Sequence, residues 1–161
     1  AASLIAPSLY LGPCTAASSR DFISSNAVTH ILSIGCSPSK RFEGVTYQRV
    51  ALDDSPTSSI TKACDVACDF IDDALNSQQG NGRILVHCKL GISRSSTIVA
   101  AYLMRRREMS LRDALRQILQ ARPQIQPNPG FILQLKEMEM GLRGEVSLDI
   151  VEFSKLQKDR L

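Results

Sequence analysis

The segment that most constrains the fold of this chain is a short apolar run at residues 83–87 (RILVH). A continuous apolar run of this length is typical of a strand at the centre of a sheet that is covered on both faces. A mostly polar loop follows, and residues 95–106 then predict a helix whose first half is apolar nearly all round. A buried strand that passes through a tight loop into a buried helix indicates an α/β fold.

Further strand and helix patterns alternate along the rest of the chain. Strands are predicted at residues 4–12 (an edge strand or a pair of short strands), 29–35 and 45–52. Helices are predicted at residues 15–26, 60–75, 110–122 and 128–142, the last two from capping residues as well as from apolar spacing. This order predicts an α/β domain with a central, mostly parallel mixed sheet that is flanked by helices.

The length of 161 residues suits a single domain with a substantial core. We expect the domain to span residues 1–143, and we expect a C-terminal tail at residues 144–161 whose mixed pattern allows a helix. The sequence predicts no particular oligomeric state.

Charge, hydropathy and cysteine content narrow the classes of partner. A net charge of +3 is too small to indicate a nucleic-acid-binding protein, and no apolar run reaches the roughly 18 residues of a membrane span. Neither a nucleic acid nor a membrane is therefore an expected partner. The 5 cysteines are an odd number in a mid-sized domain, which indicates free thiols in a reducing compartment. We expect a cytoplasmic or nuclear location.

The loop between the buried strand and the buried helix has the properties of an anion site. It reads HCKLGISRSS and follows the carboxyl end of a strand, where α/β sheets bind their ligands. Inward-turned backbone N–H groups and a helix N-terminus both attract anions, and a tetrahedral phosphate ester fits such a cradle. Glycine permits a backbone conformation that a side chain would obstruct. The predicted substrate-binding residues are Lys89, Leu90, Gly91, Ile92, Ser93 and Arg94.

The same loop contains residues that can perform phosphoryl transfer. Cys88 lies at the base of the cradle, where the anion-binding groups would lower a thiol pKa from about 8.5 to roughly 3.5–7.5 and provide a nucleophilic thiolate. Arg94 has a planar guanidinium that can bond two phosphoryl oxygens at once. Ser95 can donate a hydrogen bond to the sulfur and help it leave the phosphoenzyme. His87 is predicted to be a structural residue that bonds the loop backbone.

A general acid for the leaving group must come from elsewhere in the chain. Asp53 and Asp54 follow the strand predicted at 45–52, so both would lie at the same edge of the sheet. Reasoning from the residues alone leaves both open. Cys64 and Cys68 are spaced as metal ligands could be, but they lie on or beside an apolar helical stripe, and we predict core packing there.

Several segments resemble the dual-specificity branch of the cysteine-dependent protein phosphatases. The resemblance rests on SLYLGP, VALDDS, HCKLGISRSS, AYLM and RPQIQPNPGFILQL, and it covers about residues 4–142. It implies hydrolysis of phosphotyrosine and phosphoserine or phosphothreonine in phosphorylated proteins through a phosphocysteine, with no metal or other cofactor. It also implies that the acid is Asp54, 34 positions before Cys88. The chain is similar to a small atypical member or to an isolated catalytic domain.

Two other functions remain open at this stage. The same loop would serve a phosphatase of non-protein esters such as phosphoinositides, phosphoglucans or RNA 5′-phosphates. Lys89 is the only basic residue between Cys88 and Arg94, which is fewer than the resemblance would imply for a lipid-directed enzyme. A phosphatase-like fold could also bind phosphorylated partners without turnover, although a complete set of cysteine, arginine and aspartate argues against that.

Overall fold

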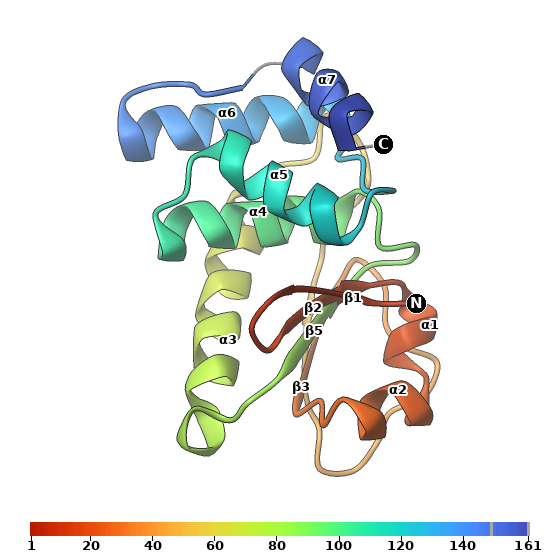
Figure 1. The fold of residues 1–161 in the computed structure, drawn as a ribbon. Helices are drawn as coiled ribbons and strands as arrows, with labels where there is room; N and C mark the ends of the chain where they lie inside the picture. Colours follow the sequence, from red (N-terminus) through yellow and green to blue (C-terminus); the bar gives the residue numbers. More distant parts are fainter. Residues whose placement is uncertain (149, 161) are drawn as a thin grey trace.

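A five-stranded sheet lies at the centre of the computed structural model, which describes residues 1–148 and 150–160 (Figure 1). The strand order is β1-β2-β5-β3-β4, with β1 and β2 antiparallel and the other neighbours parallel. This arrangement confirms the predicted mostly parallel mixed sheet, and residues 4–12 contribute a pair of short strands. The strands are β1 (Ser3–Ala6), β2 (Leu9–Gly12), β3 (His30–Ile34), β4 (Thr46–Val50) and β5 (Ile84–His87).

The central position of β5 explains its continuously apolar sequence. This strand lies between β2 and β3, and alternate side chains point to opposite faces. Ile84 and Val86 join the larger hydrophobic core, and Leu85 joins a smaller one on the other face. Residues 88–94, which we call the phosphate loop after the ligand predicted for them, thus start from a strand that is packed on both sides.

Helices cover both faces of the sheet (Figure 1). The smaller core is covered by α1 (Cys14–Ala17) and α2 (Arg20–Ser25), and the larger by the remaining helices. Among the described residues, no helix has the length and apolar character that a membrane span requires. The helices on the larger core are α3 (Thr61–Gly80), α4 (Arg94–Arg107), α5 (Leu111–Ala121), α6 (Pro129–Arg143) and α7 (Ile150–Arg160).

The prediction of a single helix at residues 15–26 is wrong, because the structure has two separate helices there, α1 and α2. The hydroxyl of Ser19 accepts a 3.2 Å hydrogen bond from the Phe22 N–H and caps a new helix. Serine favours such a cap over a position inside a helix, because its side chain competes for backbone hydrogen bonds. The caps predicted for α5 and α6 are confirmed, since Ser110 accepts from the Asp113 N–H at 3.1 Å and Asn128 accepts from the Phe131 N–H at 2.9 Å.

A buried carboxylate attaches the C-terminal segment to the domain. Glu139 of α6 is fully buried and accepts hydrogen bonds from the Leu111 N–H at 2.8 Å and from the Ser147 N–H and hydroxyl at 2.8 and 2.6 Å. Beyond this anchor, Phe153 and Leu156 of α7 are buried in the larger core. The helix α7 therefore packs on the domain and shares its core.

Candidate active site

The Cys88 side chain lies at the base of the phosphate loop, directly after β5. It is 3% exposed, and the N–H groups of Gly91, Ile92 and Ser95 are directed at its Sγ atom. The Ser95 hydroxyl is also 3.0 Å from that sulfur. The loop backbone thus turns several donors toward one atom, which is the arrangement expected of an anion cradle.

Two opposing effects act on the pKa of the Cys88 thiol. Burial raises this pKa, because the charged form loses water, while the Ser95 hydroxyl and the N–H groups of Ser95, Gly91 and Ile92 lower it. The hydrogen bonds outweigh burial, and the pKa of Cys88 lies below its ordinary value. A larger fraction of this thiol is therefore ionised at neutral pH than in an unperturbed cysteine.

His87 supports the loop from beneath. Its ring is fully buried, with Nε2 2.6 Å from the Ser33 hydroxyl and Nδ1 3.1 Å from the Cys88 carbonyl oxygen. Burial lowers the pKa of His87, which keeps the imidazole neutral at pH 7. The carbonyl can only accept, so Nδ1 carries the proton and donates to it, and Nε2 accepts from Ser33. The predicted structural role of His87 is confirmed, and no sequence pattern indicated its partner.

The Arg94 side chain is held between the loops that follow β3 and β4. Its Nη1 donates to the Leu52 carbonyl oxygen at 3.3 Å. Gly35 has a φ of +79°, and a Cβ at that position would collide with the Arg94 guanidinium and with the Leu52 carbonyl. The glycine therefore leaves room for the guanidinium at the edge of the site.

The structure places Asp54, and not Asp53, beside the phosphate loop. The Asp54 Oδ1 accepts hydrogen bonds from the Ser93 hydroxyl at 2.7 Å and from the Asn128 side-chain amide at 2.9 Å. The Ser93 hydroxyl in turn accepts from the Asn128 N–H at 3.0 Å. Both aspartates are exposed, but only Asp54 is among the residues that line the cavity above Cys88.

A cavity of about 490 Å³ opens above the phosphate loop. Two of the predicted site residues, Ser95 and Gly91, do not line this cavity. Ser95 lies beside the Cys88 sulfur. Gly91 packs against Gly12, and the Gly91 N–H points at Cys88. Gln126 and Asn128 line the cavity and were not among the predicted site residues. The lining residues are Asp54, Cys88, Lys89, Leu90, Ile92, Ser93, Arg94, Gln126 and Asn128.

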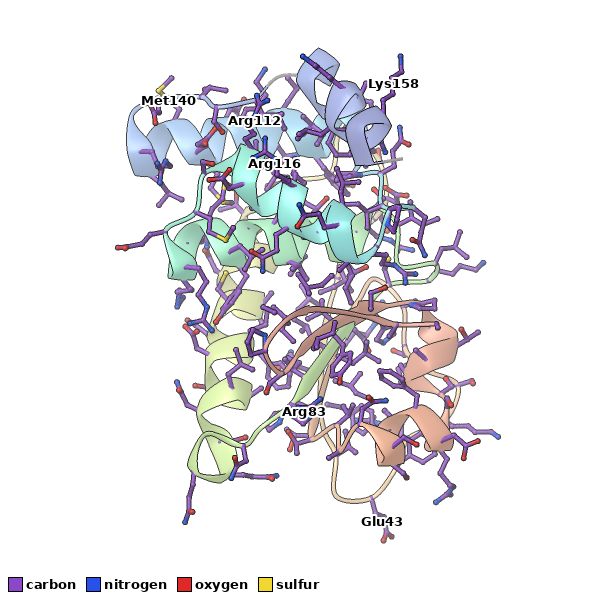
Figure 2. The ribbon with its side chains drawn as sticks, viewed as in Figure 1. Glu43, Arg83, Arg112, Arg116, Met140 and Lys158 are labelled. Atoms are coloured by element: carbon purple, nitrogen blue, oxygen red, sulfur yellow. The ribbon has the colours of Figure 1, made fainter. Side chains whose placement is uncertain are left out.

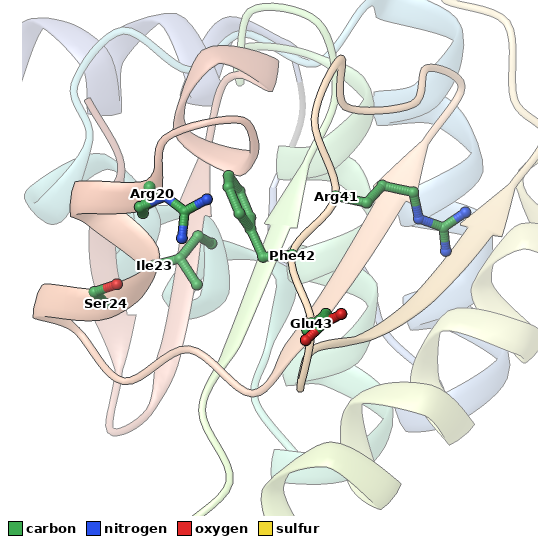
Figure 3. A pocket seen from close by; sticks show the side chains of 6 residues that line it. All are labelled: Arg20, Ile23, Ser24, Arg41, Phe42 and Glu43. Carbon is green, nitrogen blue, oxygen red and sulfur yellow. The ribbon is translucent and has the colours of Figure 1, made fainter.

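A second cavity, of about 440 Å³, lies between α2 and the segment that joins β3 to β4 (Figure 3). It contains none of the predicted catalytic residues. The Arg20 guanidinium lies over the Phe42 ring, 5.3 Å from its centroid, and that of Arg41 lies over the Tyr47 ring at 4.4 Å. Both cations of this cavity are thus already paired with aromatic rings.

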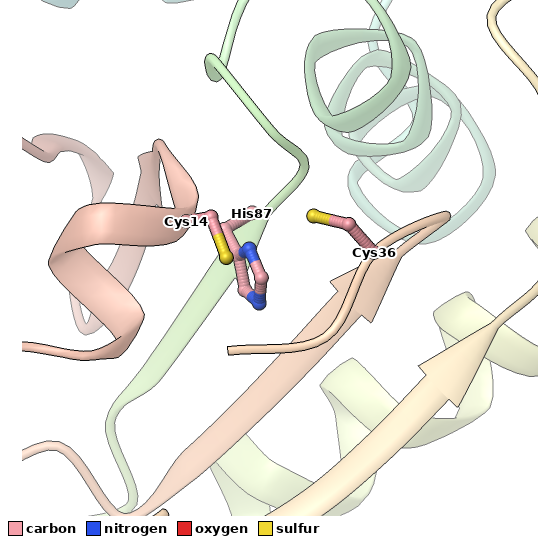
Figure 4. A group of neighbouring side chains, drawn as sticks. All are labelled: Cys14, Cys36 and His87. Carbon is pink, nitrogen blue, oxygen red and sulfur yellow. The ribbon is translucent and has the colours of Figure 1, made fainter. Parts of the chain in front are cut away.

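Within the described part of the chain, one group of side chains is close enough to hold a metal ion. The ligand atoms of Cys14, Cys36 and His87 lie within 4.8 Å of one another (Figure 4). However, both nitrogens of His87 already have hydrogen-bond partners, and burial, together with Cys14, raises the pKa of Cys36 to about 11. A metal ion would have to displace thiol protons and one of these hydrogen bonds.

The other cysteine pair belongs to the hydrophobic core. Cys64 and Cys68 are fully buried in the larger core, and burial raises the pKa of Cys64 to about 12. This placement confirms the prediction of core packing. Both residues are buried packing groups of α3 and lie near Arg105 of α4.

Comparisons with known proteins find similar sequences and similar structures. Residues 9–140 match the dual specificity phosphatase catalytic domain. Dual specificity protein phosphatase 1 of Arabidopsis thaliana is 41% identical over 142 residues, which cover 88% of this chain and 70% of that protein. The crystal structure of human DUSP28 has a TM-score of 0.80 at 34% identity, over 88% of this chain and 95% of that one. The human tyrosine phosphatase-like serine/threonine/tyrosine-interacting protein has a TM-score of 0.77 at 33% identity, over 86% and 95%.

Proposed function

This chain belongs to the dual-specificity protein phosphatases, and on that premise we propose that it hydrolyses phosphotyrosine and phosphoserine or phosphothreonine in proteins through a phosphocysteine on Cys88. One observation carries this proposal. The N–H groups of the loop converge on the Cys88 sulfur, and Arg94 and Asp54 line the same cavity. Nucleophile, cation and carboxyl group are thus gathered around a space that a phosphoryl group can enter.

In the first half of the reaction, the Cys88 thiolate attacks phosphorus and the bond to the ester oxygen breaks. The loop N–H groups and the Arg94 fork bind the phosphoryl oxygens, whose charge they stabilise through the transition state. The Asp54 carboxyl donates a proton to the leaving oxygen, so the product leaves as a neutral alcohol or phenol.

In the second half, water hydrolyses the phosphocysteine. The Asp54 carboxylate takes a proton from the attacking water, and the phosphorus–sulfur bond breaks. The sulfur leaves as a thiolate and accepts a hydrogen bond from the Ser95 hydroxyl, which lies 3.0 Å away. Each cycle thereby restores the thiolate and the protonated Asp54.

Turnover measurements test the proposal directly. The purified chain is assayed in EDTA with a nitrophenyl phosphate and with phosphotyrosine and phosphothreonine peptides, with Cys88→Ser as the inactive control. We expect turnover of all three by the wild type and none by Cys88→Ser, which keeps phosphate binding. Activity on the aryl ester but on neither peptide would point to a non-protein ester as the substrate.

A binding role without turnover is the second candidate. It is favoured by the similarity to a human protein named a phosphatase-like interacting protein. The presence of Cys88, Arg94 and Asp54 in one cavity supports catalysis instead. Phosphopeptide binding by the wild type without product release would establish the binding role.

The proposed substrate class and location follow from the same features. Lys89 and Arg94 are the basic residues among those that line the cavity, which suits one phosphoryl group better than a polyphosphorylated lipid headgroup. We propose a cytoplasmic or nuclear location, which is supported by five free cysteines at residues 14, 36, 64, 68 and 88.

A further inference from the structure

A buried arginine lies behind the phosphate loop, outside the cavity. Arg122 follows the last turn of α5 and is only 3% exposed. Its Nε donates to the Gly91 carbonyl oxygen at 2.8 Å, and its Nη2 donates to the Leu90 carbonyl oxygen at 3.2 Å. On the other side, Nη1 donates to the Ala1 carbonyl at 2.6 Å and to the Ser3 hydroxyl at 3.3 Å. A charged group this deeply buried needs such partners.

The two loop carbonyls that Arg122 holds belong to the peptide units that face Cys88. A trans peptide is planar, and its C=O and N–H point in opposite directions. The Leu90 carbonyl shares a peptide plane with the Gly91 N–H, and the Gly91 carbonyl shares one with the Ile92 N–H. Both of those N–H groups are directed at the Cys88 sulfur. By holding the two carbonyls, Arg122 therefore sets the direction in which the N–H groups of Gly91 and Ile92 point.

The packing around Gly91 leaves little freedom for another arrangement. Gly91 has a φ of +70°, and a Cβ there would collide with the Gly12 backbone and with the Arg122 guanidinium. Burial lowers the pKa of Arg122 while the Cys88 charge opposes that effect, so the two groups are within electrostatic range. The guanidinium and the thiolate thus act on opposite ends of the same two peptide planes.

We propose that Arg122 is a positioning residue of the phosphate loop. Its guanidinium holds the carbonyls of Leu90 and Gly91, and the N–H groups of Gly91 and Ile92 therefore stay turned toward the thiolate and the phosphoryl group. This inference rests on the proposed phosphatase function of the same loop. Arg122 acts through the loop backbone and touches no substrate.

The test compares Arg122→Lys and Arg122→Gln with Arg83→Gln. Arg83 is a matched control, because it lies just before β5 at the end of the strand away from the phosphate loop and donates to the Asn26 carbonyl at 2.6 Å (Figure 2). The first measurement is the pH dependence of Cys88 alkylation by iodoacetamide, followed on the Cys88 peptide by mass spectrometry. The second is the affinity for orthovanadate, and the third is kcat for a nitrophenyl phosphate.

We expect both Arg122 variants to move the midpoint of alkylation to higher pH, because the N–H groups that stabilise the thiolate lose their fixed direction. Vanadate affinity should fall about tenfold or more, and kcat should fall by about 10- to 100-fold, which is typical of a small displacement of catalytic groups. Lysine keeps the charge but cannot hold both carbonyls in a fork, so Arg122→Lys should resemble Arg122→Gln. Arg83→Gln should change none of the three quantities.

An Arg122→Lys variant that matches the wild type in alkylation midpoint and vanadate affinity would overturn the proposal. Thermal unfolding of each variant shows whether it is folded, and if Arg122→Gln is not, the more conservative Arg122→Lys decides. Alkylation and vanadate binding need no turnover. A wild type that hydrolyses no ester would therefore refute the phosphatase function while still testing Arg122.

Discussion

The Asp54 carboxylate accepts a 2.7 Å hydrogen bond from the Ser93 hydroxyl, which joins the loop after β4 to the phosphate loop. Asn128, at the start of α6, donates to the same oxygen at 2.9 Å. Three segments that are distant in sequence therefore meet at one carboxyl group beside Cys88. This relationship gives the proposed acid a defined place and makes its role testable.

The identity of the general acid can be read from the effect of the leaving group. Asp54→Ala should lower kcat on phosphothreonine peptides by about 10²- to 10⁴-fold, because an alkoxide cannot leave without a proton. The loss should be much smaller on a nitrophenyl ester, whose leaving group is stable as an anion. Asp53→Ala is the matched control and should stay near the wild type on both substrates. If the dependence on leaving group follows Asp53 instead, the proposed acid is the wrong residue.

The support that Asn128 gives to Asp54 can be separated from its role as a helix cap. Asn128→Ser keeps a capping oxygen for α6 but is too short to reach Asp54. We expect stability near that of the wild type and a loss of kcat of about tenfold on phosphothreonine peptides, with little change on the nitrophenyl ester. Ser110→Ala is the control that removes the cap of α5. It should cost about 0.5–2 kcal/mol of stability without changing the ratio of kcat on the phosphothreonine peptide to kcat on the nitrophenyl ester. Unfolding by urea and steady-state kinetics measure both effects.

The pH dependence should report the thiol of Cys88. A protonated thiol is a poor nucleophile, so kcat/KM should fall as the pH falls through the lowered pKa of Cys88. Ser95→Ala removes a hydrogen bond that lowers this pKa, and the acidic limb should therefore move to higher pH. The same variant should slow phosphoenzyme hydrolysis, which a burst in pre-steady-state kinetics would reveal. An acidic limb that Ser95→Ala leaves in place would show that the hydroxyl does not act on the thiolate.

The cysteines should differ sharply in reactivity at pH 7. Cys88 has a lowered pKa, whereas the pKa of Cys36 is raised to about 11 and that of Cys64 to about 12, burial being the largest cause in both. Dilute peroxide should therefore oxidise Cys88 first and inactivate the enzyme, and a thiol reductant should restore activity unless oxidation has passed the sulfenic acid. Mass spectrometry of the cysteine peptides during the reaction measures the order. Loss of activity before any change at Cys88 would contradict this prediction.

The room that Gly35 leaves for Arg94 predicts a specific defect. Gly35→Ala should lower kcat by at least tenfold, because the new Cβ would push the guanidinium and the Leu52 carbonyl apart. Gly44→Ala is a matched control, since Gly44 has a φ of +81° but no atom within 4 Å of the added Cβ. Each variant should lose about 1 kcal/mol of stability from the strained backbone, and Gly35→Ala should lose more because its Cβ also collides with the Leu52 carbonyl. Equal kcat in the two variants would show that Gly35 has only a backbone role.

The phosphate loop and its surroundings were predictable because their signals are local. Cys88, Arg94 and Ser95 lie within eight consecutive residues, and the apolar run before them and the apolar helix after them are visible in the sequence alone. A strand and a helix joined by so short a loop can hardly place these side chains far apart. The caps at Ser110 and Asn128 were predictable for the same reason, since each bonds an N–H three residues away.

Local signals failed where neighbouring preferences compete. Residues 15–26 contain enough apolar and helix-compatible residues for one helix, yet Ser19 starts a second one. Glu139 lies on a helix of mixed character, where a buried carboxylate has no sequence signature. Its partners, Leu111 and Ser147, belong to other segments, and only the packing of α5 and α6 brings them to it.

The position of Cys88 at the base of its loop and the α/β order of elements could be predicted from the sequence, because both depend on spacing along the chain. Reasoning from the residues alone did not distinguish Asp53 from Asp54 as the general acid, and only the family resemblance favoured Asp54. The tertiary structure decided that Asp54 meets Ser93 across 39 residues and that Arg122 meets Gly91 across 31. Such contacts depend on the register of packed strands and helices, and hydrogen bonds require donor and acceptor within about 3 Å. No spacing along one chain specifies a distance of that size between separate elements.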